Sequence, residues 1–243
     1  MEQFFAKDFT GPAFELFGPA HWTVLAIVGL LNACLLLWGQ RIPEQWRGKV
    51  RITLAVVLLV NEVAWHVWNW ATGQWTLQTM LPLHLCSVFV YVSAAALITK
   101  NYRLYEFVYF LGIIGAAQPL FTPDLGRYGY PHFRFFQTFI SHGSIVTAAI
   151  YLTVVEGYRP TFQSLRRVLV WGNVYMAAVG VVNALLGSNY LFIAHKPDTP
   201  SLIDLMPPWP WYILVIELMA VLLVTLLYLP FVRLNTNILP VRT

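Results

Sequence analysis

Charged residues are scarce in this chain. Of its 243 residues, 15 are basic, 11 are acidic and 58% are hydrophobic. Soluble globular proteins carry about 25% charged residues, so a charged fraction of 11% is too small to cover a water-facing surface. The composition argues against a soluble enzyme, a disordered protein and a nucleic-acid-binding module. The expected fold class is an all-α polytopic membrane protein.

Cysteine and clustered histidine are also scarce. Cys34 and Cys86 are the only cysteines, too few for a disulfide framework or a cysteine metal site. The histidines stand singly, without His-x-x-x-His spacing, so neither a metal nor another cofactor is expected. The N-terminus lacks the basic segment and the cleavage site of a secretory signal peptide. The first apolar stretch is therefore expected to be retained as a helix.

Seven apolar stretches are long enough to cross a bilayer, which takes roughly 20 mostly apolar residues. Proline is favoured in the first helical turn, so Pro19, Pro82 and Pro210 are expected to begin the first, third and seventh helices. Linkers, low-complexity tracts and repeats are lacking, so residues 1–243 are expected to form a single seven-helix transmembrane domain. The predicted spans are 20–38, 52–71, 82–99, 104–121, 135–155, 168–187 and 210–230.

The basic residues divide unequally between the two sides of these spans. Eleven fall on one side and four on the other, namely Lys7, Arg127, Arg134 and Lys196. Because cytoplasmic loops carry the excess of Lys and Arg, the N-terminus is expected outside and the C-terminus inside. The same asymmetry explains the net charge of +4, so no nucleic-acid partner is expected.

Polar residues within the spans gather toward the outer side. Such residues are costly in a bilayer and are functional candidates by default. A rise of about 1.5 Å per residue brings polar groups from six spans to one level. Glu62, His66 and Asn69 are spaced to share one helix face. The set comprises Glu62, His66, Asn69, His84, Cys86, Gln118, Ser141, His142, Asn183 and Glu217.

Nucleophilic catalysis is the most specific reaction type that these residues indicate. A cysteine becomes a nucleophile when a nearby histidine takes its proton, and Cys86 with His142 could form such a pair. In a second interpretation, the same cavity binds or transports a ligand, with Glu62 and Glu217 as proton or cation sites. A receptor is a third. A purely structural interpretation makes His84 a cap or packing group and Cys86 a small buried residue. Cys34 is expected in the core, far in depth from Cys86.

Two outer loops add basic residues among aromatic ones. Arg134 follows Tyr128 and Tyr130, and the long segment 188–209 contains Lys196 and Asp204. Loops of this length are often lids or binding loops, and Arg or Lys among aromatics suits a lipid phosphate. An interfacial aromatic belt is the simpler alternative.

Several motifs occur in a characteristic order. They are His66-Val67-Trp68-Asn69-Trp70, Leu81-Pro82-Leu83-His84-Leu85-Cys86, Phe139-Ile140-Ser141-His142-Gly143, Asn189-Tyr190-Leu191-Phe192 and Pro208-Trp209-Pro210-Trp211-Tyr212. In these motifs the chain resembles YwaF-type bacterial integral membrane proteins, the prokaryotic branch of the family that includes eukaryotic transmembrane protein 164. The resemblance extends from about residue 15 to residue 230.

The resemblance implies an activity, because the eukaryotic relative is understood as a lipid acyltransferase with a Cys–His pair. By motif, the cysteine corresponds to Cys86 and the histidine to His142. The implied partner is a membrane phospholipid or lysophospholipid, and the implied location is the bacterial cell membrane. The expected reaction is acyl transfer or acyl hydrolysis through a thioester.

Overall fold

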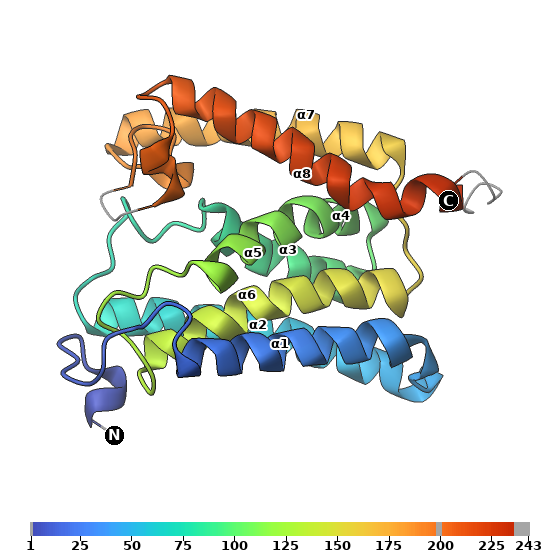
Figure 1. Ribbon diagram of the computed structural model, residues 1–243, viewed down its shortest axis with the longest axis horizontal. Coiled ribbons are helices and arrows are strands. Elements are labelled where there is room, and N and C mark those ends of the chain that lie inside the picture. Colours follow the sequence, from blue (N-terminus) through green and yellow to red (C-terminus); the bar gives the residue numbers. More distant parts are fainter. Residues whose placement is uncertain (1, 198–200, 236–243) are drawn as a thin grey trace.

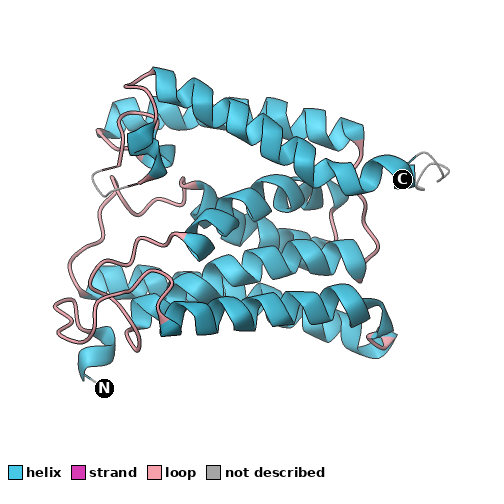
Figure 2. Cartoon of the chain, viewed as in Figure 1, coloured by secondary structure: helices cyan, strands magenta, loops and turns pink. Residues whose placement is uncertain are grey.

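The described residues form seven long helices that lie side by side and alternate in direction (Figure 1). The computed structural model describes residues 2–197 and 201–235. Figure 2 shows that the regular structure in these ranges is helical. Six helices are α1 Pro19–Trp38, α2 Glu44–Ala71, α3 Leu85–Thr99, α6 Phe133–Val154, α7 Phe162–Leu186 and α8 Trp211–Asn235. The remaining one is continuous through α4 Tyr102–Phe107, the π-helical turn η3 Val108–Gly112 and α5 Ile113–Phe121.

The connections differ in length at the two ends of the bundle. At one end, here named the long-loop end, lie the connections 72–84, 122–132 and 187–210. At the other, the short-loop end, lie the connections 39–43, 100–101 and 155–161. The short 3-10 turns η2 Gly39–Arg41, η4 Tyr190–Phe192 and η5 Leu202–Leu205 belong to these connections, and η1 Glu2–Phe5 precedes α1.

Six of the helices are long and apolar enough to cross a membrane, and α3 is shorter, with 15 residues. The prediction of an all-α polytopic membrane protein is confirmed. The prediction that Pro82 begins the third helix is wrong, because α3 begins at Leu85. Tyr190 Oη accepts a hydrogen bond from the Leu81 amide, and Tyr175 Oη donates one to the Leu83 carbonyl. Contacts with α7 and η4 thus hold the preceding backbone outside the helix.

Other boundaries differ where charged residues occupy the first turns. α2 begins at Glu44 and α7 at Phe162, eight and six residues before the predicted spans. The first two turns of these helices contain Arg47, Lys49, Arg166 and Arg167, which a search for apolar residues leaves out. α7 starts where Thr161 and Ser164 form a capping box. Pro19 is in the first turn of α1 as predicted, whereas Pro210 lies immediately before α8.

The helices lie in layers around a central group. In Figure 1, α1 and α2 lie along the lower edge, α7 and α8 along the upper edge, and α3 to α6 between them. The main cluster of buried side chains comes chiefly from the central group and includes Leu97, Phe110, Ile145 and Leu152. α3 belongs to this central group and buries Phe89, Val90, Ala96 and Leu97, while Tyr91 and Ile98 remain exposed.

A buried carboxylate joins α7 to α4 at the short-loop end. The Glu106 side chain is 1% exposed and forms an ion pair with Arg167, whose side chain is 24% exposed. Ser164 Oγ also donates a hydrogen bond to Glu106 Oε1 at 2.6 Å. Two partners on α7 thus satisfy one charge that would otherwise be costly at this depth.

Replacing Glu106 with Ala should lower the thermal unfolding temperature, because Arg167 would lose the carboxylate that neutralises it. Removing one partner of a buried ion pair costs about 3 kcal/mol, at the lower end because Arg167 is partly exposed. The measurement is thermal unfolding of the purified protein in detergent. The control is Arg103→Gln. Arg103 is 62% exposed, and its Nη1 lies 3.7 Å from Glu106 Oε1, so it forms a longer and weaker ion pair with the same carboxylate. Its expected effect is below about 1 kcal/mol. Equal unfolding temperatures for Glu106→Ala and the unchanged protein would contradict the prediction.

Candidate functional site

Cys86 is the second residue of α3 and is half-buried between α3 and α5. Its Sγ donates a hydrogen bond to the Gly115 carbonyl of α5 at 3.0 Å. A Cβ atom on Gly115 would lie only 2.9 Å from Leu85 Cδ2. The missing side chain therefore lets the first turn of α3 rest directly on α5, which fixes the position of the thiol.

His142 reaches the same layer from α6. A Cβ atom on Gly112 would lie 3.3 Å from both Ile145 of α6 and Phe89 of α3, so three chain segments meet there. Cys86 on α3, Gly115 on α5 and His142 on α6 are each three residues from this meeting point, in the direction of the long-loop end. Three residues are about one helical turn, so these three residues lie at one depth. No hydrogen bond joins Cys86 to His142, and both residues are within the described part of the chain.

The hydrogen bond of His142 determines which of its ring nitrogens carries the proton. Nδ1 lies 2.6 Å from the Thr138 carbonyl oxygen. A carbonyl oxygen only accepts, so Nδ1 is the donor in the neutral ring. Nε2 is then left with a free lone pair. This is the tautomer that a general base requires, with the Thr138 carbonyl orienting the ring.

The other histidines on or next to the membrane helices have the opposite arrangement. Nδ1 accepts a hydrogen bond from Phe17 N in His21, from Trp75 Nε1 in His66, from Leu191 N in His84 and from Arg134 N in His132. In their neutral forms Nε2 therefore carries the proton. Among these five histidines, His142 alone presents an unprotonated Nε2.

Two of these histidines are structural. His21 is fully buried, and its Nε2 donates to the Leu120 carbonyl at 2.8 Å. His132 caps α6 and donates from Nε2 to the Ala6 carbonyl at 3.0 Å. Burial lowers the pKa of His132 below its usual value, against the raising effect of the Ala6 bond. Both side chains join segments distant in sequence.

Glu62 on α2 is buried but incompletely satisfied. Its side chain is 4% exposed, and Oε1 has no hydrogen-bond partner. His66 Nε2 lies 3.6 Å from this oxygen, and its Nδ1 accepts from Trp75 Nε1 at 3.0 Å. A chain of polar groups thus runs from Trp75 through His66 to Glu62.

Arg134 stands near the start of α6, on the side that faces α2. Its guanidinium lies 3.9 Å from the centre of the Trp65 ring, and Nη1 donates to Gln137 Oε1 at 2.9 Å. Asn61 Nδ2 donates to the Gln137 carbonyl at 3.0 Å. Stacking on an aromatic face and a fixed fork of donors are typical of arginines that bind phosphate.

Two predicted site residues, Asn69 and Gln118, take part in the local structure of their helices. Asn69 Nδ2 donates to the Trp65 carbonyl, and Gln118 Nε2 donates to the carbonyl and hydroxyl of Thr122. Ser141 is buried on α6, next to His142 in sequence. Asn69 and Gln118 stabilise helix ends at the long-loop end.

Asn183 of α7 and the predicted loop residues Lys196 and Asp204 bond to described residues of the connection that follows α7. Asn183 binds Ser188 Oγ and both the amide and the carbonyl of Tyr190. Lys196 Nζ donates to the Met206 carbonyl at 2.8 Å, and Asp204 accepts from the Ser201 amide at 2.7 Å. These partners account for the polar side chains without a ligand.

Glu217 is positioned by α7. Asn173 Nδ2 donates to Glu217 Oε2 at 3.0 Å, so the two residues join α7 to α8. Asn173 lies near the middle of α7, whereas Glu217, which was expected at the level of Cys86, is in the second turn of α8. Their direct contact shows that α7 and α8 are offset along the bundle. Glu217 therefore belongs to the α7–α8 pair.

Three residues with roles at the site were not singled out from the sequence. Gly115 accepts from the thiol, Thr138 orients His142, and Trp75 sets the tautomer of His66. A usable signal existed for Thr138, which is four residues before His142 and therefore on the same helix face. In the part of the chain that the structure describes, no three His, Cys, Asp or Glu side chains gather as metal ligands.

The tautomers can be measured by nitrogen NMR of the protein with labelled histidine. We expect the His142 ring to carry its proton on Nδ1 and the His21 and His132 rings on Nε2, because their backbone partners allow no other arrangement. His142→Gln identifies the signal by removing it, and His195→Gln, in the long loop, is the control. An Nε2-protonated ring at His142 would contradict the assignment.

Comparison with known proteins identifies a family for the chain. No curated protein and no solved structure matches the chain. The model of the TMEM164 family matches residues 16–228. This range contains the first six long helices, most of α8, and both Cys86 and His142. By this match over most of its length, the chain is an integral membrane protein that belongs to the TMEM164 family.

Proposed function

We propose that the protein is a membrane lipid acyltransferase or acyl hydrolase with Cys86 as nucleophile and His142 as general base. The observation that carries the proposal is the hydrogen bond from His142 Nδ1 to the Thr138 carbonyl. It leaves Nε2 free to take a proton in the layer that also contains the Cys86 thiol. Motif resemblance to a Cys–His acyltransferase supports the same pair.

The reaction runs in two halves. The Cys86 sulfur attacks the acyl carbonyl of a phospholipid ester, and its proton moves to His142 Nε2. The carbon–oxygen ester bond breaks, and His142 returns the proton to the leaving lysophospholipid oxygen. A lysophospholipid hydroxyl or water then attacks the thioester, giving its proton to His142. The carbon–sulfur bond breaks, and the thiol recovers the proton.

The start of α3 supplies further groups for this chemistry. His84 is the N-cap residue, and its side chain makes no capping hydrogen bond. The first amides of a helix lack partners within it and carry its positive dipole end. The first-turn amides around Cys86 are therefore suitable donors to the oxyanion of a tetrahedral intermediate. His84 itself carries its proton on Nε2 and can donate to the same oxygen.

The substrate is a membrane phospholipid or lysophospholipid, because the site lies within apolar helices near the long-loop end. Arg134, stacked on Trp65, is the group that binds the lipid phosphate. With the N-terminus outside and the C-terminus inside, the long-loop end faces the outer leaflet. The motif resemblance supports assignment to the YwaF-type branch in a bacterial cell membrane, with residues 1–243 acting as one seven-helix domain.

A second candidate function is lipid or solute binding without chemistry. One observation favours it, namely the buried Oε1 of Glu62 that has no hydrogen-bond partner and faces His66. Unpaired carboxylates at membrane depth are typical of proton sites in transporters. Activity that depends on Cys86 decides between the two candidates.

Replacing Cys86 or His142 with Ala should abolish acyl exchange between labelled phospholipid and lysophospholipid in reconstituted vesicles. Loss of the nucleophile removes the covalent route, and loss of the base costs about 10²- to 10⁴-fold. Cys34→Ala and His195→Gln are matched controls of the same residue types and should retain full rates. Undiminished exchange in Cys86→Ala and His142→Ala would refute the assignment and leave the binding function.

Replacing Arg134 with Gln should raise KM for phospholipid about tenfold, because a charge-assisted bond to the phosphate is lost. The value of kcat should change little, since Arg134 is placed at the headgroup and away from the thiol. Steady-state acyl exchange at varied lipid density separates the two constants. Arg127→Gln, an exposed arginine paired with Asp8 in the same region, is the control. A fall in kcat at constant KM would place Arg134 in the chemical step instead.

A further inference from the structure

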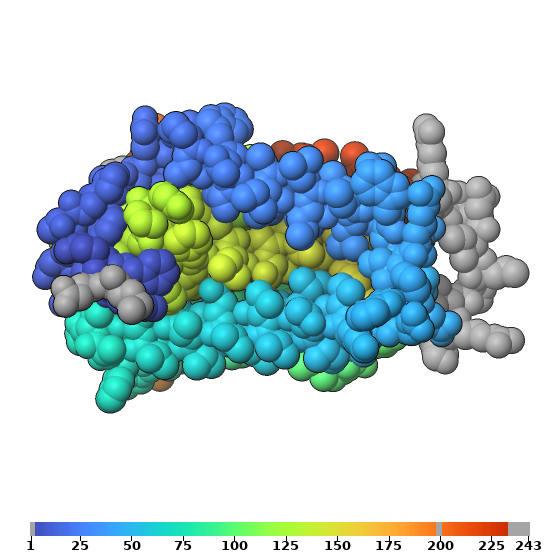
Figure 3. Space-filling model, turned by 90° about the horizontal axis from the view of Figure 1, so that it is seen from below, coloured from blue at the N-terminus to red at the C-terminus, as the bar shows by residue number. Residues whose placement is uncertain are grey.

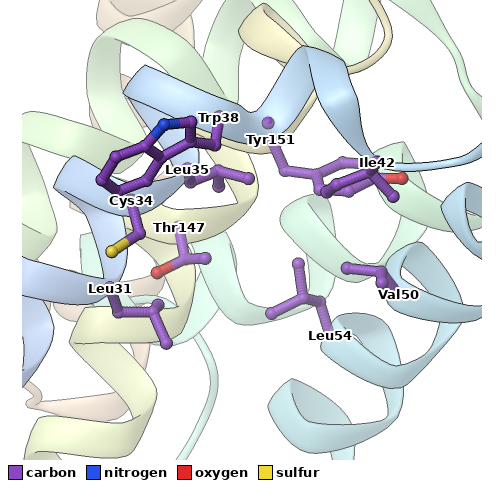
Figure 4. Close-up of a pocket in the computed structure, with 10 residues that line it drawn as sticks. Leu31, Cys34, Leu35, Trp38, Ile42, Val50, Leu54, Thr147 and Tyr151 are labelled. Carbon is purple, nitrogen blue, oxygen red and sulfur yellow. The ribbon is translucent and has the colours of Figure 1, made fainter.

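An apolar groove lies on the membrane-facing side of the molecule, away from Cys86. Figure 3 shows α6 as the floor of a furrow between α1 and α2. Near the short-loop end, the furrow deepens into a groove of about 460 Å³, drawn in Figure 4. The lining residues are Leu31, Cys34, Leu35, Trp38, Gly39, Ile42, Val50, Leu54, Thr147 and Tyr151.

The two hydroxyl groups of the lining are bonded to the protein. Thr147 Oγ1 donates to the Gly143 carbonyl at 2.8 Å, and Tyr151 Oη donates to the Arg47 carbonyl at 2.6 Å. Cys34 was expected in the core, but it is exposed and lies on the groove wall. The surface left for an occupant is therefore almost wholly apolar, which suits a hydrocarbon chain.

The groove, measured along the bundle, is shorter than the thickness of one leaflet. Its α1 wall runs from Trp38 to Leu31, which at 1.5 Å per residue is about 11 Å. Half the hydrocarbon thickness of a bilayer is about 15 Å. A Cβ atom on Gly39 would lie 3.0 Å from Val154, so the η2 turn rests on α6 and closes the groove at the short-loop end. An acyl chain can therefore enter from the side and point toward the bilayer midplane.

The η2 turn and the start of α2, at the closed end of the groove, are rich in basic residues. The stretch 39–51 carries Arg41, Arg47, Lys49 and Arg51 against one acid, Glu44. Arg51 turns toward Glu156 of the connection after α6, and Arg47 donates to the Ile42 carbonyl beside the groove. In the described chain, no acidic side chain lies within ion-pair distance of Arg41 or Lys49, and both are exposed. This end thus offers unneutralised positive charge.

We propose that this groove is a binding site for an anionic phospholipid of the leaflet at the short-loop end. One acyl chain lies between α1 and α2 on α6, and the headgroup phosphate meets Arg41 and Lys49. Charge complementarity selects an anionic lipid, because each basic residue near an anionic headgroup contributes about 1 kcal/mol. The site lies at the opposite end of the bundle from Cys86 and does not depend on catalysis.

The test measures lipid retained by the purified protein. Protein is reconstituted in nanodiscs of equal phosphatidylglycerol and phosphatidylcholine, extracted in mild detergent and analysed by native mass spectrometry. We expect one retained phosphatidylglycerol per chain. The double variant Arg41→Gln/Lys49→Gln should lower the preference for phosphatidylglycerol about 30-fold, as expected for two basic residues. The variant Leu31→Trp should lose both lipids by filling the groove.

Matched controls locate the effect. Arg103→Gln/Arg166→Gln removes two charges at the short-loop end away from the groove and should keep the preference. Leu222→Trp enlarges a leucine on α8 as exposed as Leu31, 57% against 53%, and should keep the lipid. Cys86→Ala should also keep it, which separates this site from the proposed acyl transfer. Thermal unfolding of each variant verifies folding.

Three results would overturn the proposal. The first is an unchanged lipid preference in folded Arg41→Gln/Lys49→Gln, and the second is full retention in folded Leu31→Trp. The third is a dimer without bound lipid that Leu31→Trp disrupts, which would assign the groove to a second copy of the chain.

Discussion

The first turn of α3 lies directly on Gly115 of α5, and the arrangement of the candidate site depends on this contact. Any side chain at Gly115 would displace Leu85 and, with it, the adjacent Cys86. Tyr175 and Tyr190 hold the preceding backbone, so α3 begins inside the bundle instead of at its surface. The helix start therefore brings a thiol and a set of free amides to one place within the membrane.

Satisfying polar groups in an apolar solvent explains most of the intramembrane side chains. Asn69, Asn183 and Gln118 bond to backbone or side-chain groups of their own helix ends and loops, and Glu217 bonds to Asn173. Each unsatisfied group would cost several kcal/mol in lipid. Against this background, the free Nε2 of His142 and the buried atoms without a partner, Oε1 of Glu62, Oδ1 of Asn32 and Oγ of Ser93, are exceptions in the described chain. Exceptions of this kind are where function is to be sought.

The two ends of the bundle differ in chemistry. At the long-loop end, Cys86, His142 and Arg134 make up the proposed acyl-transfer site. At the short-loop end, the Glu106–Arg167 pair fastens α7 to α4, and the basic turn after α1 closes an apolar groove. Phospholipid thus has two proposed roles, as substrate at one end and as bound ligand at the other.

Composition and hydropathy by themselves determined the class of the protein and the approximate positions of its helices. A helical segment in lipid forms its backbone hydrogen bonds within itself. Its length and apolarity therefore predict a membrane span without knowledge of its neighbours. The charged first turns of α2 and α7 escaped the prediction, because they lie where apolarity is not required.

The sequence also nominated Cys86 and His142 as a pair, through depth and motif. Only the tertiary structure decided where α3 begins, because residues more than 90 positions away hold Leu83 and Leu81. It also decided that Cys34 lines a groove and that His142, unlike His66, presents a free Nε2. Exposure and proton position depend on neighbours brought together by packing, and no local pattern of residues encodes those neighbours.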